Sequence, residues 1–400
     1  MDFTSFVKEL LHIDDGFQVS RIEREIDSQP FIRIYLEYQL PYCTIGDITY
    51  PLYDHAPVRT WQHLCWFEYP CFIVCRLPRY INSDGKVKVM EVSFADKGKS
   101  YTRLFSSHVI AALQEIKVQN AVAGLFCTSP YIVRSIMENA VAKALEARGD
   151  ITDLTTISLD EKAFKEGHHY ATILVDSKKD CVVELAEGRA EKDVKALLYS
   201  ITSQETQPQL ERVNIDMWQP YINVIEEVAP QATMVHDKFH IVKKLSEAID
   251  KTRREEVKNE PMLKNNRYTV LKNEDNRTQN QQSVFEQIDK ANLKTAQAWH
   301  IRENFKSLFE IQDRTVSGNM LYDWMAHSLT KGLRFVNEVI ATIKNHVTGV
   351  VNALITCTDS AKHENTNGRI QAILAKARGF LNFDRFRINV LFYFGKLEFH

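Results

Sequence analysis

The chain has 400 residues, of which 44% are hydrophobic and 26% are charged, and its formal net charge is −2. This length and composition predict a folded, soluble chain with two or three domains that have their own cores. The near-neutral charge gives no global argument for nucleic-acid binding, so any basic surface has to be sought locally.

Three further patterns bear on the compartment. No stretch approaches the roughly 20 consecutive apolar residues that a membrane span requires, so we expect no membrane partner. The start, Met1 to Thr4, lacks the basic and then apolar pattern of a signal peptide. The seven cysteines are scattered from Cys43 to Cys357, which suits a reducing compartment better than a disulfide framework. We therefore expect a cytoplasmic protein.

Residues 1–100 are rich in aromatic and β-branched residues. Short runs alternate between the two sides of a strand, as in Phe31–Leu36 and Val87–Val92. This pattern predicts a small antiparallel β module.

Residues 101–150 change to a helical pattern. A tight turn is expected before Ser129, which can cap a new helix with Pro130 at its first position. The exposed side at the start of that helix carries Tyr131, Arg134 and Ser135, which suits a helix-turn-helix whose second helix enters the major groove of DNA. A short helical hairpin with no role in DNA binding has a similar pattern.

Gly149-Asp150 marks a boundary, and residues 151–400 are predicted to form an α/β domain. Apolar runs at 155–159, 170–175 and 181–185 predict three strands, followed by a helix near 190–203, a strand before Asp216, a helix near 219–228 and a strand at 232–236. This order is that of a ribonuclease H-like sheet. The sequence from about 245 to 355 shows only helical periodicity and polar linkers, which predicts an all-helical insertion.

Two carboxylates stand at strand ends in this domain. Asp160 closes the first apolar strand and Asp216 closes a later one. If the strands are adjacent, the two acids could bridge a pair of Mg²⁺ or Mn²⁺ ions, with a third acid from a helix, as phosphoryl transfer requires. The competing interpretation is a pair of ordinary turn residues.

Other polar residues follow the last strand. Asp237 and His240 stand three apart where they could orient the site or contact phosphate, and Lys243 and Lys244 follow them. The last forty residues are also locally basic and include Arg369 and Arg378, which either supply a surface for a phosphate backbone or form a solvated helix face.

Several segments together resemble the DDE transposases of bacterial insertion sequences in the ISL3 family. They are Leu154–Lys162, Asp216–Trp218, His236–His240, Asn292–Trp299 and Ala377–Phe380. The resemblance runs from about residue 53 to 397, in one order and without large gaps.

The resemblance implies a nucleoid-associated enzyme that binds the terminal inverted repeats of its own element, nicks their 3′ ends with Mg²⁺ or Mn²⁺, and transfers them to target DNA as a homodimer. Asp160 and Asp216 match the first two metal-binding acids, and Glu364 matches the third, in Glu364-Asn365-Thr366-Asn367. Glu303 is the alternative third acid. Asp237 and His240 match an accessory motif, and Trp218 is expected to pack against DNA or stack on it.

The chain also departs from the family. Members commonly carry an N-terminal zinc ribbon, whereas here only Cys43 remains of its cysteine pairs, so residues 1–100 are expected to form a degenerate zinc-ribbon-like module without structural zinc. Cys65, Cys71 and Cys75 are expected to be buried thiols. The segment before Glu364 also differs from the family pattern. The alternative functions are therefore a catalytically inactive or domesticated DNA-binding derivative, and a structure-specific nuclease on the same scaffold.

Overall fold

The computed structural model describes residues 3–11, 13–26, 30–149, 151, 153–201, 210–311, 313–356, 360–377 and 379–399, without the side chains of 3, 10, 360–367 and 376. The chain forms two compact units. The N-terminal unit is Met1–Ala147 with Leu397–His400, and the C-terminal unit is Arg148–Lys396.

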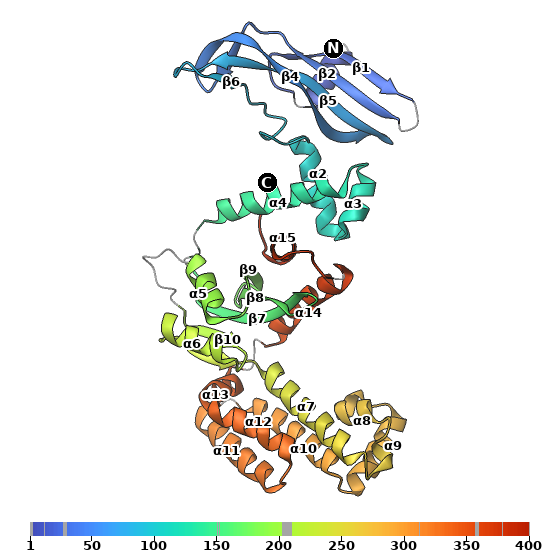
Figure 1. Ribbon diagram of the computed structural model, residues 1–400, viewed down its shortest axis with the longest axis vertical. Coiled ribbons are helices and arrows are strands. Elements are labelled where there is room, and N and C mark those ends of the chain that lie inside the picture. The colour runs from blue at the N-terminus through green and yellow to red at the C-terminus, as the bar shows by residue number, and fades with distance from the viewer. Residues whose placement is uncertain are drawn as a thin grey trace. The chain divides into compact units, whose positions relative to one another are not determined.

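The N-terminal unit is built on a six-stranded sheet in the order β1-β2-β5-β4-β3, with β6 beside β5 (Figure 1). Its elements are helix α1 (Phe3–Leu10) and strands β1 (Phe17–Glu25), β2 (Phe31–Tyr38), β3 (Tyr42–Ile45), β4 (Ile48–Trp66), β5 (Tyr69–Ile81) and β6 (Val87–Val89). The sheet is not purely antiparallel as predicted, because β2 runs parallel to β5. The β3–β4 hairpin, which lies between them in the chain, pairs on the other side of β5.

The core of this sheet contains cysteines as well as large apolar side chains. Cys71 and Cys75 are buried with Trp61 and Ile73, and burial raises the pKa of both thiols to about 12. Because zinc binds the thiolate, this environment favours apolar packing of protonated thiols. The predicted lack of structural zinc stays a prediction.

Three helices complete the N-terminal unit: α2 (Arg103–Ile116), α3 (Gln119–Leu125) and α4 (Pro130–Arg148). The predicted cap is confirmed, since the hydroxyl of Ser129 accepts a hydrogen bond from the Ile132 N–H at 3.2 Å. The turn before α4 is fixed to β4, because Gln62 accepts from the Thr128 hydroxyl at 2.7 Å and donates to the Cys127 carbonyl at 3.1 Å.

The C-terminal unit contains a five-stranded sheet in the order β11-β10-β7-β8-β9. The strands are β7 (Thr156–Lys165), β8 (His169–Asp176), β9 (Cys181–Glu187), β10 (Arg212–Ile215) and β11 (Thr233–His236). The strand β10 runs parallel to both β7 and β11, whereas β8 is antiparallel to β7 and β9. Asp160 does not close its strand as predicted, because β7 continues for five residues beyond it in a hairpin with β8.

Helices pack on this sheet and extend from it. Two of them, α5 (Glu191–Ser200) and α6 (Gln219–Val228), share a core with Ile157 and Val213. The helix α15 (Phe383–Phe394), which follows α14 (Ser360–Ala377), contacts β9 through Arg387, whose guanidinium donates two hydrogen bonds to the Glu184 carboxylate at 2.7 and 2.5 Å.

Between β11 and α14 the described chain is helical (Figure 1). The helices are α7 (Lys238–Glu256), α8 (Arg267–Leu271), α9 (Gln279–Lys290), α10 (Lys294–Ser307), α11 (Arg314–Thr330), α12 (Arg334–Asn345) and α13 (Val347–Ile355), with short 3₁₀ turns at Pro261–Leu263, Glu274–Asn276 and Leu308–Glu310. Leu245, Phe305 and Ile340 belong to the core of this insertion. No helix in the described part of the chain is long and apolar enough to cross a membrane.

Candidate active site

Three aspartates stand in one row across adjacent parallel strands. The pairing sets Asn214 of β10 opposite Ser158 of β7, and Ile215 opposite His236 of β11. Continuing this register places Asp216 level with Asp160 on one side and with Asp237 on the other. The fold therefore brings the first two predicted acids and one accessory acid to the same edge of the sheet.

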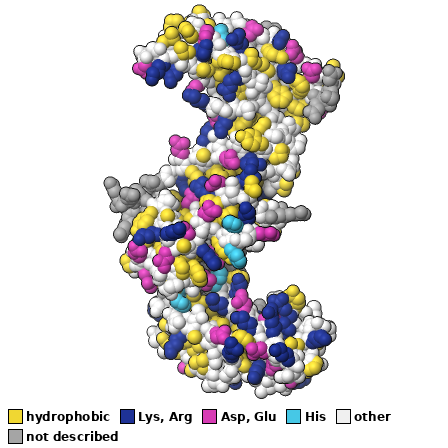
Figure 2. Space-filling model, in the orientation of Figure 1, with side chains coloured by type: hydrophobic (Ala, Val, Ile, Leu, Met, Phe, Trp, Pro, Cys, Tyr) yellow, Lys and Arg dark blue, Asp and Glu magenta, His cyan; other side chains and the backbone are white. Residues whose placement is uncertain are grey.

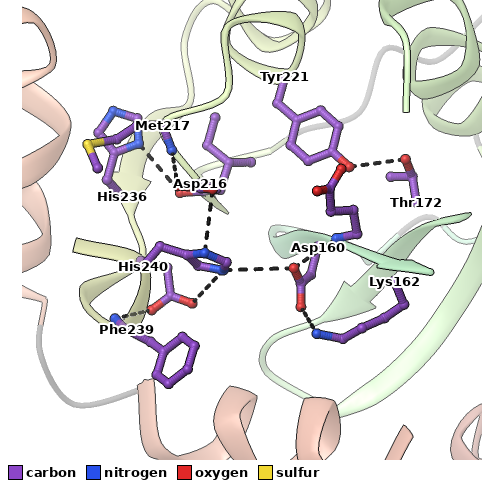
Figure 3. A network of polar contacts seen from close by, with 12 residues as sticks. Asp160, Lys162, Thr172, Asp216, Met217, Tyr221, His236, Phe239 and His240 are labelled. Atoms are coloured by element: carbon purple, nitrogen blue, oxygen red, sulfur yellow. Dashed lines mark hydrogen bonds and ion pairs between the residues drawn. The ribbon is translucent and has the colours of Figure 1, made fainter. Parts of the chain in front are cut away.

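His240 lies between these carboxylates and contacts all three. Its Nδ1 is 3.4 Å from Asp216 Oδ2, and its Nε2 is 3.8 Å from Asp160 Oδ1 and 3.9 Å from Asp237 Oδ2. Figure 3 shows the imidazole between Asp160 and Asp216. His240 reaches this position because α7 begins directly after β11, with Asp237 as its N-cap accepting from the Phe239 N–H at 2.8 Å.

The carboxylates of Asp160 and Asp216 have further partners. Asp160 Oδ1 accepts from the Glu161 N–H at 2.8 Å, and Oδ2 accepts from the Lys162 ammonium at 2.7 Å. Asp216 Oδ1 accepts from the Met217 N–H at 2.6 Å. Lys162 was missed in the sequence, although a residue two positions from Asp160 on a strand lies on the same face. Its ammonium is in direct contact with the Asp160 carboxylate.

The donor set at this edge fits a hard divalent cation, because two carboxylates converge on one imidazole and both remain partly accessible. The side chains of Asp160 and Asp216 are 12% and 31% exposed. Carboxylate oxygens are the ligands that Mg²⁺ and Mn²⁺ prefer. Among the described residues, no group of three or more His, Cys, Asp or Glu side chains has the arrangement of a metal site.

The two candidates for the third acid, Glu364 and Glu303, lie in different helices. Glu364 lies in α14, and its side chain is outside the described residues. Glu303, in α10, is already engaged, since its carboxylate contacts Arg302 and Lys306 at 2.8 Å each. The contacts of Glu303 are those of a structural ion-pair cluster.

The edge of the sheet is anchored to the helical insertion by His236, the last residue of β11. Burial lowers the pKa of His236 to about 4, so the ring is neutral, and its Nδ1 lies 3.4 Å from the Ile215 carbonyl. The neighbouring helix α13 approaches it at Gly349, and the Asn352 side chain donates to the Met234 carbonyl at 2.7 Å. The helix α13 of the insertion thus packs against the end of β11, directly before Asp237 in the chain.

A cationic and aromatic group lies beside the acids. Arg189 donates to both carboxylate oxygens of Glu161 at 3.1 Å. Its guanidinium carbon is 4.1 Å from the centroid of the Tyr170 ring and 5.2 Å from that of Trp218. Trp218 was predicted as a site residue, but Glu161, Tyr170 and Arg189 were not, because they come from β7, from β8 and from the loop after β9, which only the fold brings together.

The predicted DNA-binding residues are distributed over both units. In α4, Tyr131 is 72% exposed, whereas Arg134 and Ser135 are half-buried. In α7, Lys243 is exposed and Lys244 half-buried.

The basic residues near the end of the chain differ in their surroundings. Arg369 is exposed with its guanidinium 5.0 Å from the Phe394 ring centroid, while Arg378 lies outside the described residues. Arg387 is paired with Glu184 and is not a free cation. Figure 2 shows Lys and Arg side chains gathered on the helical insertion near α8, where Arg254 and Arg267 contact buried Asp250.

The chain is similar in sequence to known proteins. A family model described as a transposase, of the ISL3 DDE type, matches residues 157–390. The chain is 24% identical over 388 residues to the transposase for insertion sequence element IS1001 of Bordetella parapertussis, with 94% of each chain covered. It is also 24% identical over 358 residues to the transposase for insertion sequence element IS1557 of Mycobacterium tuberculosis, covering 82% of this chain and 80% of the relative.

The matched family model defines the class of protein as a transposase, and the match spans more than half of the chain. The chain belongs to the ISL3 family of DDE transposases.

Proposed function

We propose that this transposase binds the terminal inverted repeats of its insertion sequence and carries out metal-dependent strand cleavage and transfer into target DNA in the bacterial cytoplasm. The observation that carries the proposal is the row of Asp160, Asp216 and Asp237 around His240 at one edge of the sheet. DNA is the partner implied by family membership.

The fold of the C-terminal unit supports a ribonuclease H-like catalytic domain. Counted from the first strand of the unit, the sheet order is 3-2-1-4-5, and only the second strand runs opposite to the rest. This strand order and these strand directions are those of ribonuclease H-like sheets. In this chain a helical insertion follows the fifth strand.

The proposed roles in the chemistry are supported by the geometry at Asp160 and Asp216 and, for Glu364, by the family resemblance. Asp160, Asp216 and Glu364 would hold a pair of Mg²⁺ or Mn²⁺ ions, which would supply activation of the attacking oxygen and stabilisation of the leaving oxygen of a phosphodiester. Lys162 and His240 hold the carboxylates of Asp160 and Asp216 in orientation through the contacts described above. Asp237 fixes the start of α7 and with it the position of His240.

The N-terminal unit is proposed to recognise the DNA ends. The helices α3 and α4, with the intervening turn fixed to β4, serve as a helix-turn-helix that presents Tyr131, Arg134 and Ser135 to the major groove. Two ends have to be brought together in transposition, so a homodimer on DNA is part of the proposal.

The test is 3′-end cleavage of a labelled duplex that carries the element's own terminal repeat, with Mg²⁺ or Mn²⁺. We expect Asp216→Ala to reduce cleavage by at least about 100-fold while end binding stays within about twofold, because Asp216 holds cations rather than bases. Asp289→Ala, which removes an exposed acid of the helical insertion, is the matched control and should cleave as the wild type does.

Two outcomes would contradict parts of the proposal. Binding without cleavage by the wild-type protein would identify an inactive derivative that keeps only DNA recognition. Loss of end binding in Asp216→Ala would contradict the division between recognition by the N-terminal unit and chemistry at the acids.

A further inference from the structure

Arg189 is the centre of a preformed stack beside the aspartates. Its guanidinium lies over the Tyr170 ring on β8 and within 5.2 Å of the Trp218 ring centroid at the start of α6. Both contacts lie within the range of cation–π interactions. We call Tyr170, Arg189 and Trp218 the Arg189 platform.

The platform is attached to the same two segments that carry the acids. Glu161, which holds Arg189, directly follows Asp160, and Trp218 comes two residues after Asp216. Neighbouring side chains on a strand point to opposite faces, so Glu161 and Asp160 lie on opposite sides of β7. The Glu161–Arg189 pair therefore lies on the face of β7 opposite to Asp160, and Trp218 connects the platform to the end of β10, where Asp216 lies.

The loop that carries Arg189 is fixed by its neighbours. The Gly188 N–H donates to the Tyr170 carbonyl at 2.8 Å, and the Gly188 carbonyl accepts from the Thr172 hydroxyl at 2.8 Å. The Thr172 hydroxyl also lies 3.1 Å from the buried Tyr221 hydroxyl. These contacts hold the guanidinium in place before any ligand arrives.

We propose that the Arg189 platform binds a nucleobase of the DNA strand that is cut, by stacking on the exposed face of Trp218, and so positions the adjacent phosphodiester at Asp160 and Asp216. The proposal rests on the proposed transposase function and adds a substrate contact to it. In this proposal the base stacks on Trp218, and Arg189 and Tyr170 support the Trp218 ring.

The charges of the platform favour a base over a phosphate as the ligand. Glu161 meets the charge of Arg189 with two hydrogen bonds, so the pair carries no net charge toward an anion. The Trp218 ring remains 42% exposed although its neighbours are fixed, which leaves area for a flat aromatic ligand. Every base has such a face, so stacking contributes to binding without reading sequence.

The experiment uses full-length protein and duplexes carrying the terminal repeat, each with one 2-aminopurine at a different position around the cleaved bond. In the absence of divalent metal, we expect wild-type protein to quench the fluorescence of one or two adjacent positions by at least about threefold. Trp218→Ala should lose this quenching, Trp218→Phe should keep most of it, and Arg189→Met should weaken it. Tyr199→Ala, which removes a 47% exposed aromatic ring from α5, is the matched control and should quench as the wild type does.

A second measurement leaves the protein unchanged. An abasic site at the quenched position should weaken end binding by about tenfold, the effect expected for loss of one stacked base. This arm keeps the proposal testable if Trp218→Ala fails to fold.

The outcomes separate the platform from the chemistry when cleavage with Mg²⁺ is measured on the same duplexes. Cleavage by the wild type with no quenched position, or equal quenching by Trp218→Ala, overturns the platform and leaves the transposase function intact. Quenching that depends on Trp218 without cleavage supports the platform and counts against the proposed chemistry.

Discussion

Both oxygens of Asp160 already have partners, since Oδ2 accepts from Lys162 and Oδ1 faces His240. These contacts offset the repulsion among carboxylates that share one edge of the sheet. A divalent cation proposed for this site would have to share or replace these contacts, and its binding would cost the rearrangement of Lys162. The proposed third acid would add negative charge that favours the divalent cation over the ammonium of Lys162.

The choice between Glu364 and Glu303 gives a prediction from paired variants. Glu364→Gln should reduce metal-dependent cleavage by at least about 100-fold with end binding unchanged, because an amide keeps the size of the side chain but loses the charge that holds a cation. Glu303→Gln should retain cleavage within about threefold, since Glu303 is engaged by Arg302 and Lys306. The measurement is end cleavage by the two variants in parallel, and the reverse pattern would assign the third acid to Glu303.

At the scale of elements, the apolar runs predicted the buried parts of the strands in the C-terminal unit but not their exposed ends. The predicted strand 155–159 stops at Asp160, whereas β7 continues to Lys165. The extension is polar because it pairs with β8 at an exposed end of the sheet, where alternation carries little signal. Asp160 thus lies at the site because the register of β7 with β10 sets it level with Asp216, and not because its strand ends there.

The pairing of strands that are distant in the chain was the second feature that the sequence did not predict. Alternation shows which side chains share a face but not which strand lies next to which, so the parallel pair of β2 and β5 was not predicted. The same limit hid Arg189, whose partners Glu161 and Tyr170 come from two strands of a hairpin. Asp216, Asp237 and His240 were found because they stand at or shortly after the ends of apolar strands, which is a local pattern, and because their segments resemble the family.

The junction of α13 with β11 gives a prediction at this scale. A Cβ added at Gly349 would lie 2.4 Å from His236 Cδ2, and the ring is buried and fixed at the Ile215 carbonyl. Gly349→Ala should therefore lower the free energy of unfolding by about 1–3 kcal/mol through overpacking. Gly318→Ala, also in a helix but with nothing within 4 Å of the added carbon, should instead raise it by about 0.5–1 kcal/mol.

Denaturant unfolding of the two glycine variants with the wild type measures this difference. Because His236 precedes Asp237 directly, Gly349→Ala should also reduce cleavage, and Gly318→Ala should not. Equal stability of Gly349→Ala and the wild type would show that α13 moves away from β11 without cost.

At the scale of the whole molecule, recognition and chemistry are assigned to different compact units. The proposed recognition helix α4 belongs mainly to the N-terminal unit, whereas Asp160, Asp216 and Asp237 belong to the C-terminal unit. A change in one unit should therefore alter one property and spare the other, which sets the last prediction.

Arg134→Ala should weaken binding to the terminal repeat by about tenfold or more and binding to random DNA by less than about twofold, if Arg134 reads a base edge. Arg134→Lys is the matched control, because lysine keeps the charge but lacks the planar fork that bonds guanine at two points. Equilibrium binding at several salt concentrations separates the two roles. Restoration by lysine, together with equal loss on both DNAs in Arg134→Ala and a shallower salt dependence, would make Arg134 a phosphate contact.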